Sequence, residues 1–351
     1  MKIIVLAGGL STERDVSLAS AAGICQTLVE KGHQAFLLDV FLGLPDAPDN
    51  LEEVFTLPDH GLSITKNISS LEPDLEAVKA SRKDNSPCFF GPNVIELCRL
   101  ADITFLGLHG GEGENGKLQA AFDLLGIRYT GPNFLGCAIA MDKGLTKQIF
   151  MEAGVDTPNG TCLQKNSPNH SLESLGLSLP VVVKPCSGGS SIGVYIVHTE
   201  EEYQDALKNS FRYEDQVVIE TYIKGREFAC GIIDDQVLPP IEIIPKQGFF
   251  DYANKYQAGA TTEICPAQIP EEITKRMQEL TKKAFHALNL DVYSRADFLL
   301  DDAGNLYCLE MNTLPGMTSA SLLPQEAKAA GIEYTDLCEL IIEKSLKARY
   351  Q

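Results

Sequence analysis

Two short runs near the carboxyl end hold side chains suited to binding a cation. "SRADF" places Arg295 and Asp297 two residues apart, and "LEMN" does the same for Glu310 and Asn312. In a β-strand, residues i and i+2 project from the same face. The turn sequence "DDAGN" between the runs predicts a hairpin that gathers Asp297, Glu310 and Asn312. Two carboxylates and an amide oxygen are hard ligands, so the hairpin indicates a Mg²⁺ site shared with substrate phosphates.

The alternative interpretation of this hairpin is a solvated polar sheet face. Leu309 and Met311 lie between the polar residues and supply an apolar opposite face, as a half-buried sheet requires. Without a metal, two like charges on neighbouring strands would cost stability. We therefore favour the metal site.

A glycine-serine loop led by a lysine follows the apolar run "PVVV". This loop, "KPCSGGSSIG", spans residues 184–193. Its backbone N–H groups can wrap a polyphosphate while Lys184 supplies positive charge. It is not a Walker A motif, because Val194 stands where Lys-Ser/Thr is required. A flexible hairpin tip is the alternative, and the loop alone does not decide between the two.

The stretch "HGGEGENGKLQ", residues 109–119, contains the glycine spacing G-x-G-x-x-G of a dinucleotide-binding turn. No acidic ribose ligand follows about 20 residues later, as that fingerprint requires. Glu112 and Glu114 would also place negative charge against a pyrophosphate. A glycine-rich surface turn is the plainer alternative, but it does not explain the presence of His109. These features disfavour NAD binding at this stretch.

The run "TLPGMTSASL", residues 313–322, directly follows the predicted hairpin. Gly316 exposes backbone N–H groups, and Ser321 marks the start of a helix. Helix N-termini bind carboxylates well. An ordinary serine-capped helix start is the alternative.

An α/β architecture must position these residues. In the first 135 residues, we predict parallel strands at "KIIVLAGG", "QAFLLDV", "DITFLGL" and "IRYTGP". A helix covers "TERDVSLASAAGICQTLVEKG", with Thr12 and Asp15 in capping-box spacing. Residues 42–92 are rich in Pro, Asp and Ser and are predicted to be a variable insertion.

The rest of the chain alternates β-rich runs with helices. Helices are predicted at "MDKGLTKQIFMEAG" and "EEITKRMQELTKKAFHAL". Strands are predicted at "PVVVK", "GVYIV" and "QVVIETYIKGREFACGII", before the hairpin described above.

Composition limits the class of protein. A chain of 351 residues suggests two or three domains. Its net charge of −19 disfavours nucleic acid or an anionic membrane as partner. The ten cysteines form no C-x-x-C pair and are expected to be small, buried and reduced. The apolar run at the start is too short for a signal peptide, and no run is long enough to span a membrane. We therefore expect a cytoplasmic protein.

Five separated blocks resemble the D-alanine–D-alanine ligases of the ATP-grasp superfamily, over nearly the whole chain. They are "LAGGLSTERDVSL", "HGGEGENGKLQ", "GPNFLGCAIAMDK", "KPCSGGSSIGV" and "RADF…LEMNTLPGMTSASL". The resemblance implies three domains: an N-terminal Rossmann-like domain (1–138), a central ATP-grasp domain (139–226) and a C-terminal catalytic domain (227–351). It also implies a homodimer that uses ATP and two Mg²⁺ or Mn²⁺ ions to make D-alanyl-D-alanine for peptidoglycan.

The resemblance implies roles for individual residues, each of which matches a block or its surroundings. Contacts with ATP are implied for Lys143, Lys184, Ser191, Glu220, Tyr222, Ile223 and Glu227. Amino-acid binding is implied for Glu13, His109, Lys255, Arg295, Gly316, Ser321 and Leu322. Catalytic roles are implied for Glu13, Ser190, Tyr256, Arg295, Gly316 and Ser321, and metal binding for Asp297, Glu310 and Asn312.

Three alternatives stay open beside this assignment. The first is a sister ligase that uses D-serine or D-lactate as second substrate. Tyr256 disfavours lactate, because lactate-making relatives replace this part of the loop, whereas the sequence does not exclude D-serine. The second is a non-catalytic ATP-binding module, which the intact Arg295 and Asp297 disfavour. The third is the NAD oxidoreductase discussed above.

Overall fold

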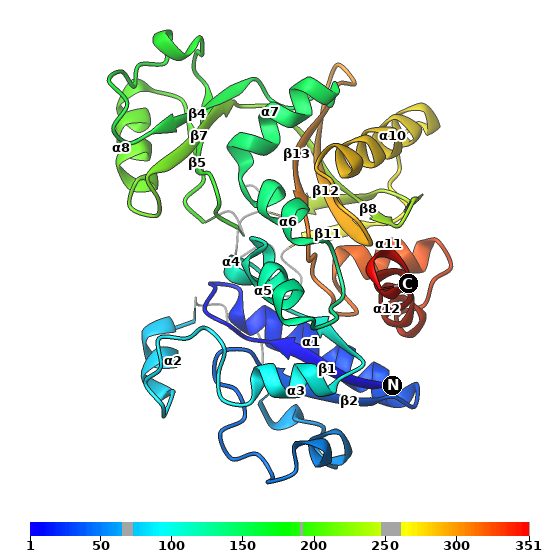
Figure 1. Cartoon of the computed structure of the whole chain (residues 1–351). Coiled ribbons are helices and arrows are strands. Elements are labelled where there is room, and N and C mark those ends of the chain that lie inside the picture. The colour runs from blue at the N-terminus through cyan, green and yellow to red at the C-terminus, as the bar shows by residue number, and fades with distance from the viewer. Residues whose placement is uncertain (65–72, 190–191, 247–260, 351) are drawn as a thin grey trace.

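The computed structural model describes residues 1–64, 73–189, 192–246 and 261–350, and it contains three sheets that follow one another along the chain (Figure 1). Ser190, Ser191, Lys255 and Tyr256 lie outside the described residues. Within the described ranges, no helix has the length and apolar character needed to cross a membrane.

The first sheet is parallel and has the order β2-β1-β3. Its strands are β1 (Lys2–Ala7), β2 (Gln34–Asp39) and β3 (Ile103–Leu106), and they confirm three of the predicted strands. Almost every residue in them is buried, as expected for a parallel sheet covered on both faces. Helix α1 (Arg14–Glu30) connects β1 to β2.

Short helices fill the rest of the N-terminal part. The predicted insertion holds η1 (Leu51–Thr56), η2 (Leu62–Ile64) and α2 (Leu75–Ser81), followed by α3 (Val94–Leu100). After β3 come α4 (Gly111–Glu114), α5 (Lys117–Leu125) and α6 (Phe134–Met141).

The predicted capping box of α1 is wrong. The helix begins at Arg14, and its N-cap residue, Glu13, makes no side-chain cap hydrogen bond. The preceding loop is held instead by a tertiary contact, in which the Ser11 hydroxyl donates to the carbonyl of His109 at 2.6 Å.

The predicted strand at "IRYTGP" is reduced to one isolated bridge between Thr104 and Tyr129. The reason lies in the next residues of the segment. The Leu106 amide, which would continue the ladder, donates instead to the Thr130 hydroxyl at 3.0 Å, and Pro132 has no N–H group to donate to β3. The amides of Tyr129 and Gly131 are not part of this ladder and donate to the hydroxyls of Tyr350 and Ser345, both at 3.2 Å.

The second sheet is antiparallel, with the order β4-β7-β5-β6. Its strands are β4 (Gly160–Gln164), β5 (Val181–Pro185), β6 (Tyr195–Val197) and β7 (Gln216–Thr221). Helix α8 (Glu200–Ser210) packs on one face and begins with a capping box between Thr199 and Glu202. Helix α7 (Lys143–Ala153) contacts β4 and β7, and η3 (Glu173–Leu175) lies in the connection from β4 to β5.

The third sheet contains the predicted hairpin and has the order β11-β10-β8-β12-β13, with β9 on β8. The bounds are β8 (Gly225–Ile233), β9 (Gln236–Val237), β10 (Ile241–Pro245), β11 (Thr261–Ile264), β12 (Tyr293–Asp301) and β13 (Leu306–Asn312). Helix α10 (Glu271–Ala287) covers one face through Met277, Ala284 and Phe285. In the hairpin, Asp297 lies opposite Glu310 and Arg295 lies opposite Asn312.

The chain ends against the first sheet. Helices α11 (Leu322–Ala329) and α12 (Tyr334–Arg349) follow the third sheet, and α12 packs on α1 (Figure 1). Leu337 and Ile341 belong to the same buried cluster as Ile3 and Leu18. The two ends of the chain therefore share one core.

Candidate active site

Two adjoining clefts lie between the three sheets. One, of about 610 Å³, is lined by the loops after β1, β3 and β13, and the other, of about 480 Å³, lies between the second and third sheets. The clefts share Lys143, Gly188, Gly189 and Glu310. All described residues of the predicted site line one cleft or both.

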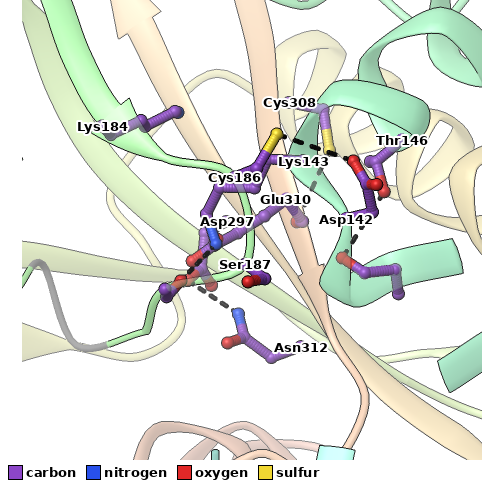
Figure 2. Close-up of polar contacts among 12 residues, drawn as sticks. Asp142, Lys143, Thr146, Lys184, Cys186, Ser187, Asp297, Cys308, Glu310 and Asn312 are labelled. Carbon is purple, nitrogen blue, oxygen red and sulfur yellow. Dashed lines mark hydrogen bonds and ion pairs between the residues drawn. The ribbon is translucent and has the colours of Figure 1, made fainter. Parts of the chain in front are cut away.

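The hairpin places the three predicted metal ligands together at this junction (Figure 2). Asp297 and Glu310 are cross-strand neighbours, and the Asn312 side-chain nitrogen donates to Asp297 Oδ2 at 2.9 Å. Arg295 forms a two-pronged ion pair with Asp297, through Nε at 2.7 Å and Nη2 at 2.9 Å. Burial opposes the charge of this guanidinium, but the Asp297 carboxylate outweighs that effect and raises the pKa of Arg295.

Lys143 connects the hairpin to the glycine-serine loop. It is the first residue of α7, and its Nζ lies 3.1 Å from Glu310 Oε2 and donates to the Gly188 carbonyl at 2.5 Å. Burial alone would lower the pKa of Lys143, but the charge of Glu310 raises it. The ammonium therefore stays charged at the junction. Glu214 holds the start of the loop, accepting bonds from the amide and hydroxyl of Ser187 at 2.7 and 2.6 Å.

Lys184 lies in a buried ion-pair triad that the sequence did not reveal. Its Nζ is 2.5 Å from Glu220 Oε1, and Lys147 Nζ is 2.8 Å from Glu220 Oε2. Burial would raise the pKa of Glu220, but the two lysines outweigh it and lower that pKa. Lys147 also donates to the Pro158 carbonyl at 2.6 Å. The sequence could have predicted Lys147 as a site residue, because it follows Lys143 by four residues and therefore lies on the same side of α7.

The remaining predicted nucleotide contacts follow at the far end of the second cleft. Tyr222, Ile223 and Glu227 line it where β7 passes into β8. The Tyr222 amide is held by the Pro180 carbonyl at 3.1 Å. Apolar side chains such as Val182, Ile223 and Phe298 also line this cleft, which suits a flat aromatic base.

Glu13 lines the first cleft, where two glycine-containing loops approach it. A Cβ added to Gly110 would lie 2.6 Å from Glu13 Oε2, and one added to Gly189 would lie 3.0 Å from it. These two glycines therefore let two loops approach the carboxylate closely. The arrangement is suited to holding an ammonium group between the loops.

His109 lines the same cleft, but protein atoms contact both of its ring nitrogens. Because a carbonyl only accepts, Nδ1–H donates to the Leu314 carbonyl at 2.9 Å. In the neutral ring, Nε2 then accepts from the Ser20 hydroxyl at 3.0 Å. Burial lowers the pKa of His109, which favours this neutral form. The ring therefore positions the Leu314 loop.

The loop after β13 confirms the predicted helix start at Ser321, the N-cap residue of α11. A Cβ on Gly316 would lie 2.9 Å from Ser321 Oγ, so this position has room only for glycine. The Ser321 hydroxyl bonds with Thr318 Oγ1 at 2.8 Å. Gly316, Ser321 and Leu322 line the cleft together and present the helix N-terminus to it.

Glu114 is a buried member of the site to which the sequence gave no role. Its two oxygens accept from the amides of Gly110 at 2.8 Å and Leu314 at 3.0 Å, which ties two cleft loops together. Burial and the charge of Glu13 raise the pKa of Glu114 to about 7. Its presence in the "HGGEGENG" stretch was the available signal.

The arrangement of charge indicates the chemistry. Cations from α7, β5 and β12 surround the junction, while the overall charge of the chain is −19. Such a local cationic site suits the transfer of a phosphoryl group between a nucleotide in one cleft and an acceptor in the other.

Comparisons with known proteins cover nearly the whole chain. A family model described as "D-ala D-ala ligase N-terminus" matches residues 2–132, and one described as "D-ala D-ala ligase C-terminus" matches residues 149–343. The D-alanine--D-alanine ligase of Pediococcus pentosaceus is 44% identical, over 97% of this chain and 97% of its own.

Solved structures are similar over the same extent. The crystal structure of the D-alanine--D-alanine ligase from Bacillus anthracis complexed with ATP has a TM-score of 0.77 and 33% identity, covering 99% of this chain and 98% of that one. The VanG D-Ala:D-Ser ligase from Enterococcus faecalis has a TM-score of 0.76 and 27% identity, covering 98% and 99%.

Proposed function

The chain belongs to the D-alanine–D-alanine ligase family, and on that premise we propose that it joins two molecules of D-alanine. The reaction converts ATP and two D-alanines into ADP, phosphate and D-alanyl-D-alanine, a precursor of peptidoglycan. The observation that carries this proposal is the junction of the two clefts at Lys143 and Glu310. A nucleotide in one cleft can thereby present its terminal phosphate to an amino acid in the other.

The first step activates a carboxylate, which is a poor electrophile. Glu13 holds the ammonium group of the first D-alanine. The carboxylate of this D-alanine attacks the γ-phosphate of ATP, which gives an acyl phosphate and ADP. This step brings one anion to another, so it needs the positive charges of Lys143, Lys184 and Arg295. The carboxylate of Glu220 keeps Lys184 in place at 2.5 Å.

The second step forms the peptide bond. The amine of the second D-alanine attacks the acyl carbon, and phosphate leaves. Arg295 and the amide of Gly316 stabilise the oxyanion that develops. The second carboxylate is bound by Ser321 and the amide of Leu322 at the start of α11, with Lys255 as a further contact.

A divalent ion completes this site in our proposal. Asp297, Glu310 and Asn312 would hold it, and two ions, Mg²⁺ or Mn²⁺, can share this donor set with phosphate oxygens. Two carboxylates and one amide oxygen are fewer ligands than octahedral Mg²⁺ takes, so phosphate oxygens and water would complete the coordination. When bound, the ion neutralises phosphate charge.

Asn312→Ala tests this assignment. We expect the Mg²⁺ concentration that gives half-maximal activity to rise about tenfold or more, in line with lost metal ligation. Asn305→Ala, in the turn of the same hairpin, is the matched control. An unchanged Mg²⁺ titration in Asn312→Ala would exclude Asn312 as a ligand.

Water must be kept from the acyl phosphate, which hydrolyses readily. We propose that a hydrogen bond between the side chains of Ser190 and Tyr256 closes two loops over the site. Ser191 would then lie near the phosphates. Tyr256→Phe should then increase ATP hydrolysis that is not coupled to ligation. If the variant and the natural chain hydrolyse the same amount of ATP per dipeptide formed, the proposed closure is wrong.

D-alanine as second substrate is favoured over D-serine by sequence. Among the solved structures named above, the D-alanine--D-alanine ligase from Bacillus anthracis is 33% identical and the D-Ala:D-Ser ligase is 27% identical, although the two folds match equally well. The deciding experiment measures ADP and dipeptide formation with D-alanine, D-serine and D-lactate side by side. Faster turnover with D-serine would overturn the D-alanine assignment, and no phosphate release with any of them would overturn the ligase.

The domain organisation and assembly complete the proposal. Three domains, 1–138, 139–226 and 227–351, are supported by one sheet in each part, and the nucleotide cleft between the second and third sheets is the expected ATP-grasp arrangement.

A homodimer is supported by the exposed apolar side chains of Leu124, Phe134 and Leu135 on the contacting helices α5 and α6. Light scattering should give twice the chain mass, and Leu124→Glu should reduce it.

A further inference from the structure

Two cysteine thiols contact each other at the start of the glycine-serine loop. Cys162 lies in β4 and Cys186 directly follows β5, and their sulfur atoms are 3.2 Å apart. All ten cysteines are free thiols, and most are buried. Neither Cys162 nor Cys186 has a role in the reaction described above.

The surroundings of the pair are built around the two sulfurs. A Cβ added to Gly144, in the first turn of α7, would lie 2.9 Å from the Cys162 sulfur and 3.1 Å from that of Cys186. The two thiols therefore occupy the space that a side chain would fill. The Gln216 amide donates to the Cys162 sulfur at 2.8 Å.

The two thiols differ in character. The hydrogen bond from Cys186 lowers the pKa of Cys162, and the bond from Gln216 acts in the same direction. The hydrogen bond with Cys162 and burial both raise the pKa of Cys186. As a residue, Cys162 is partly exposed, whereas Cys186 is buried, so we assign the first reaction with a solute to Cys162.

Cys186 is bonded to the elements that hold the phosphates (Figure 2). Its carbonyl accepts from the Lys143 amide at 2.9 Å, which fixes the start of α7. Its sulfur lies 3.7 Å from Asp142 Oδ1, the N-cap of that helix. Gly188, two residues later, accepts the bond from Lys143 Nζ. A displacement of Cys186 therefore moves both the loop and the lysine.

We propose that Cys162 and Cys186 form a reversible disulfide when the protein meets a peroxide, and that this bond impairs ATP binding. The Cys162 thiolate attacks one peroxide oxygen, the O–O bond breaks, and the leaving hydroxide takes a proton to become water. The resulting sulfenic acid is attacked by the Cys186 sulfur, which forms the S–S bond and releases a second water. Two thiols lose two electrons, and one peroxide is reduced to two waters.

The positions of the two strands predict the consequence. Strand β7 lies between β4 and β5, so forming an S–S bond must draw the backbone around Cys186 toward β4 in addition to bringing the two sulfurs together. We expect kcat/KM for ATP to fall by at least about tenfold, because a 1 Å misplacement of positioning groups can cost as much as a hundredfold. Reduction with dithiothreitol should restore it.

The first measurement is chemical and independent of the amino acids that the enzyme joins. The full chain is treated with hydrogen peroxide, alkylated, digested and analysed by mass spectrometry. A peptide pair joined through Cys162 and Cys186, lost after reduction, supports the proposal. Recovery of both as alkylated thiols, or oxidation of Cys162 alone to higher acids, overturns it.

The second measurement compares variants by ATP kinetics before and after peroxide. Cys162→Ser should retain the starting activity and resist peroxide, because its partner cannot close a bond. Cys88→Ser, at the exposed cysteine, is the matched control and should remain as sensitive as the natural chain. Equal loss of activity in Cys162→Ser and the natural chain would overturn the proposed link between the disulfide and ATP binding.

Discussion

Arg295 and Asp297 illustrate how single side chains share two tasks in this site. The guanidinium uses Nε and Nη2 for Asp297, at 2.7 and 2.9 Å, so Nη1 is not part of this ion pair, and Arg295 lines the first cleft. One residue thus orients a proposed metal ligand and can still donate to an oxyanion. Lysine offers no such fork, so it cannot replace arginine here.

Arg295→Ala should lower kcat by about a hundredfold or more, the usual effect of removing one oxyanion donor. Steady-state kinetics at saturating ATP and D-alanine measure it. Arg276→Ala is the control, because that arginine forms an ion pair with Asp156 in which both partners are largely exposed. A fall of less than about threefold would remove Arg295 from the mechanism.

Glu326 is a buried carboxyl group in α11 that predicts a pH dependence of stability. Its Oε1 accepts from the Gly231 amide at 2.9 Å, and Oε2 has no hydrogen-bond partner among the described residues. Burial raises the pKa of Glu326 from its ordinary value of 4.5 to about 8. The folded protein therefore keeps this proton at neutral pH, whereas the unfolded chain releases it.

The sign follows from the two pKa values. The contribution of Glu326 to stability is fully present below pH 4.5 and is lost as pH rises to about 8. Glu326→Gln cannot ionise, so its stability relative to the natural chain should rise with pH by up to about 1.4 kcal/mol per unit in this window. Urea unfolding from pH 5 to 8 measures it. Glu279→Gln on α10 is exposed and should show no such trend.

At the scale of elements, α7 is the part that connects the two clefts. Its first residue, Lys143, contacts the hairpin and the loop, and Lys147 one turn later contacts β7 through Glu220. Asp142 caps the helix by accepting from the Leu145 amide at 2.9 Å. A small shift of α7 would therefore move Lys143 directly and Lys184 through Glu220, and these are the two lysines proposed to contact the phosphates.

Lys147→Met removes one cation of the buried triad and leaves Glu220 with a single partner. We expect a loss of stability of about 3 kcal/mol, since breaking a buried ion pair leaves an uncompensated charge. The KM for ATP should rise because Glu220 positions Lys184. Thermal unfolding and ATP kinetics measure the two effects.

Lys165→Ala is the control for this prediction. Lys165 pairs with Asp215 at 3.0 Å in a largely exposed position, and such pairs contribute about 0–1 kcal/mol. Similar losses in both variants would show that the triad has no special importance.

At the scale of the whole molecule, the last helix stabilises the first sheet. Ile341 in α12 is fully buried in a cluster that includes β1 and α1. Arg349, at the end of the same helix, donates to the Tyr129 carbonyl at 3.0 Å and to Asp291 at 2.8 Å. The C-terminal segment therefore joins the N-terminal core to the start of β12.

Ile341→Ala should lower the free energy of unfolding by about 2–5 kcal/mol through the cavity it leaves. Glu343→Ala, two residues away and exposed, should change it by less than about 0.5 kcal/mol. Urea unfolding monitored by circular dichroism compares them. If both variants unfold together, α12 does not contribute to the core.

The sequence by itself determined the features that depend on neighbouring residues. Alternation and a turn sequence were enough to predict the hairpin of Asp297, Glu310 and Asn312, because side-chain direction in a strand follows from spacing. The resemblance supplied the other cleft residues, and every described one lines a cleft.

Only the tertiary structure decided which distant segments meet. The Lys147–Glu220 pair, the contact of Glu114 with Leu314, and the Cys162–Cys186 contact each join residues from separate elements. The same holds for the C-terminal segment, in which the hydroxyls of Ser345 and Tyr350 accept hydrogen bonds from the amides of Gly131 and Tyr129. The local sequence pattern predicts whether a side chain is buried and which face it projects from. It does not predict which distant residue that side chain contacts, because packing of the complete chain selects the contact.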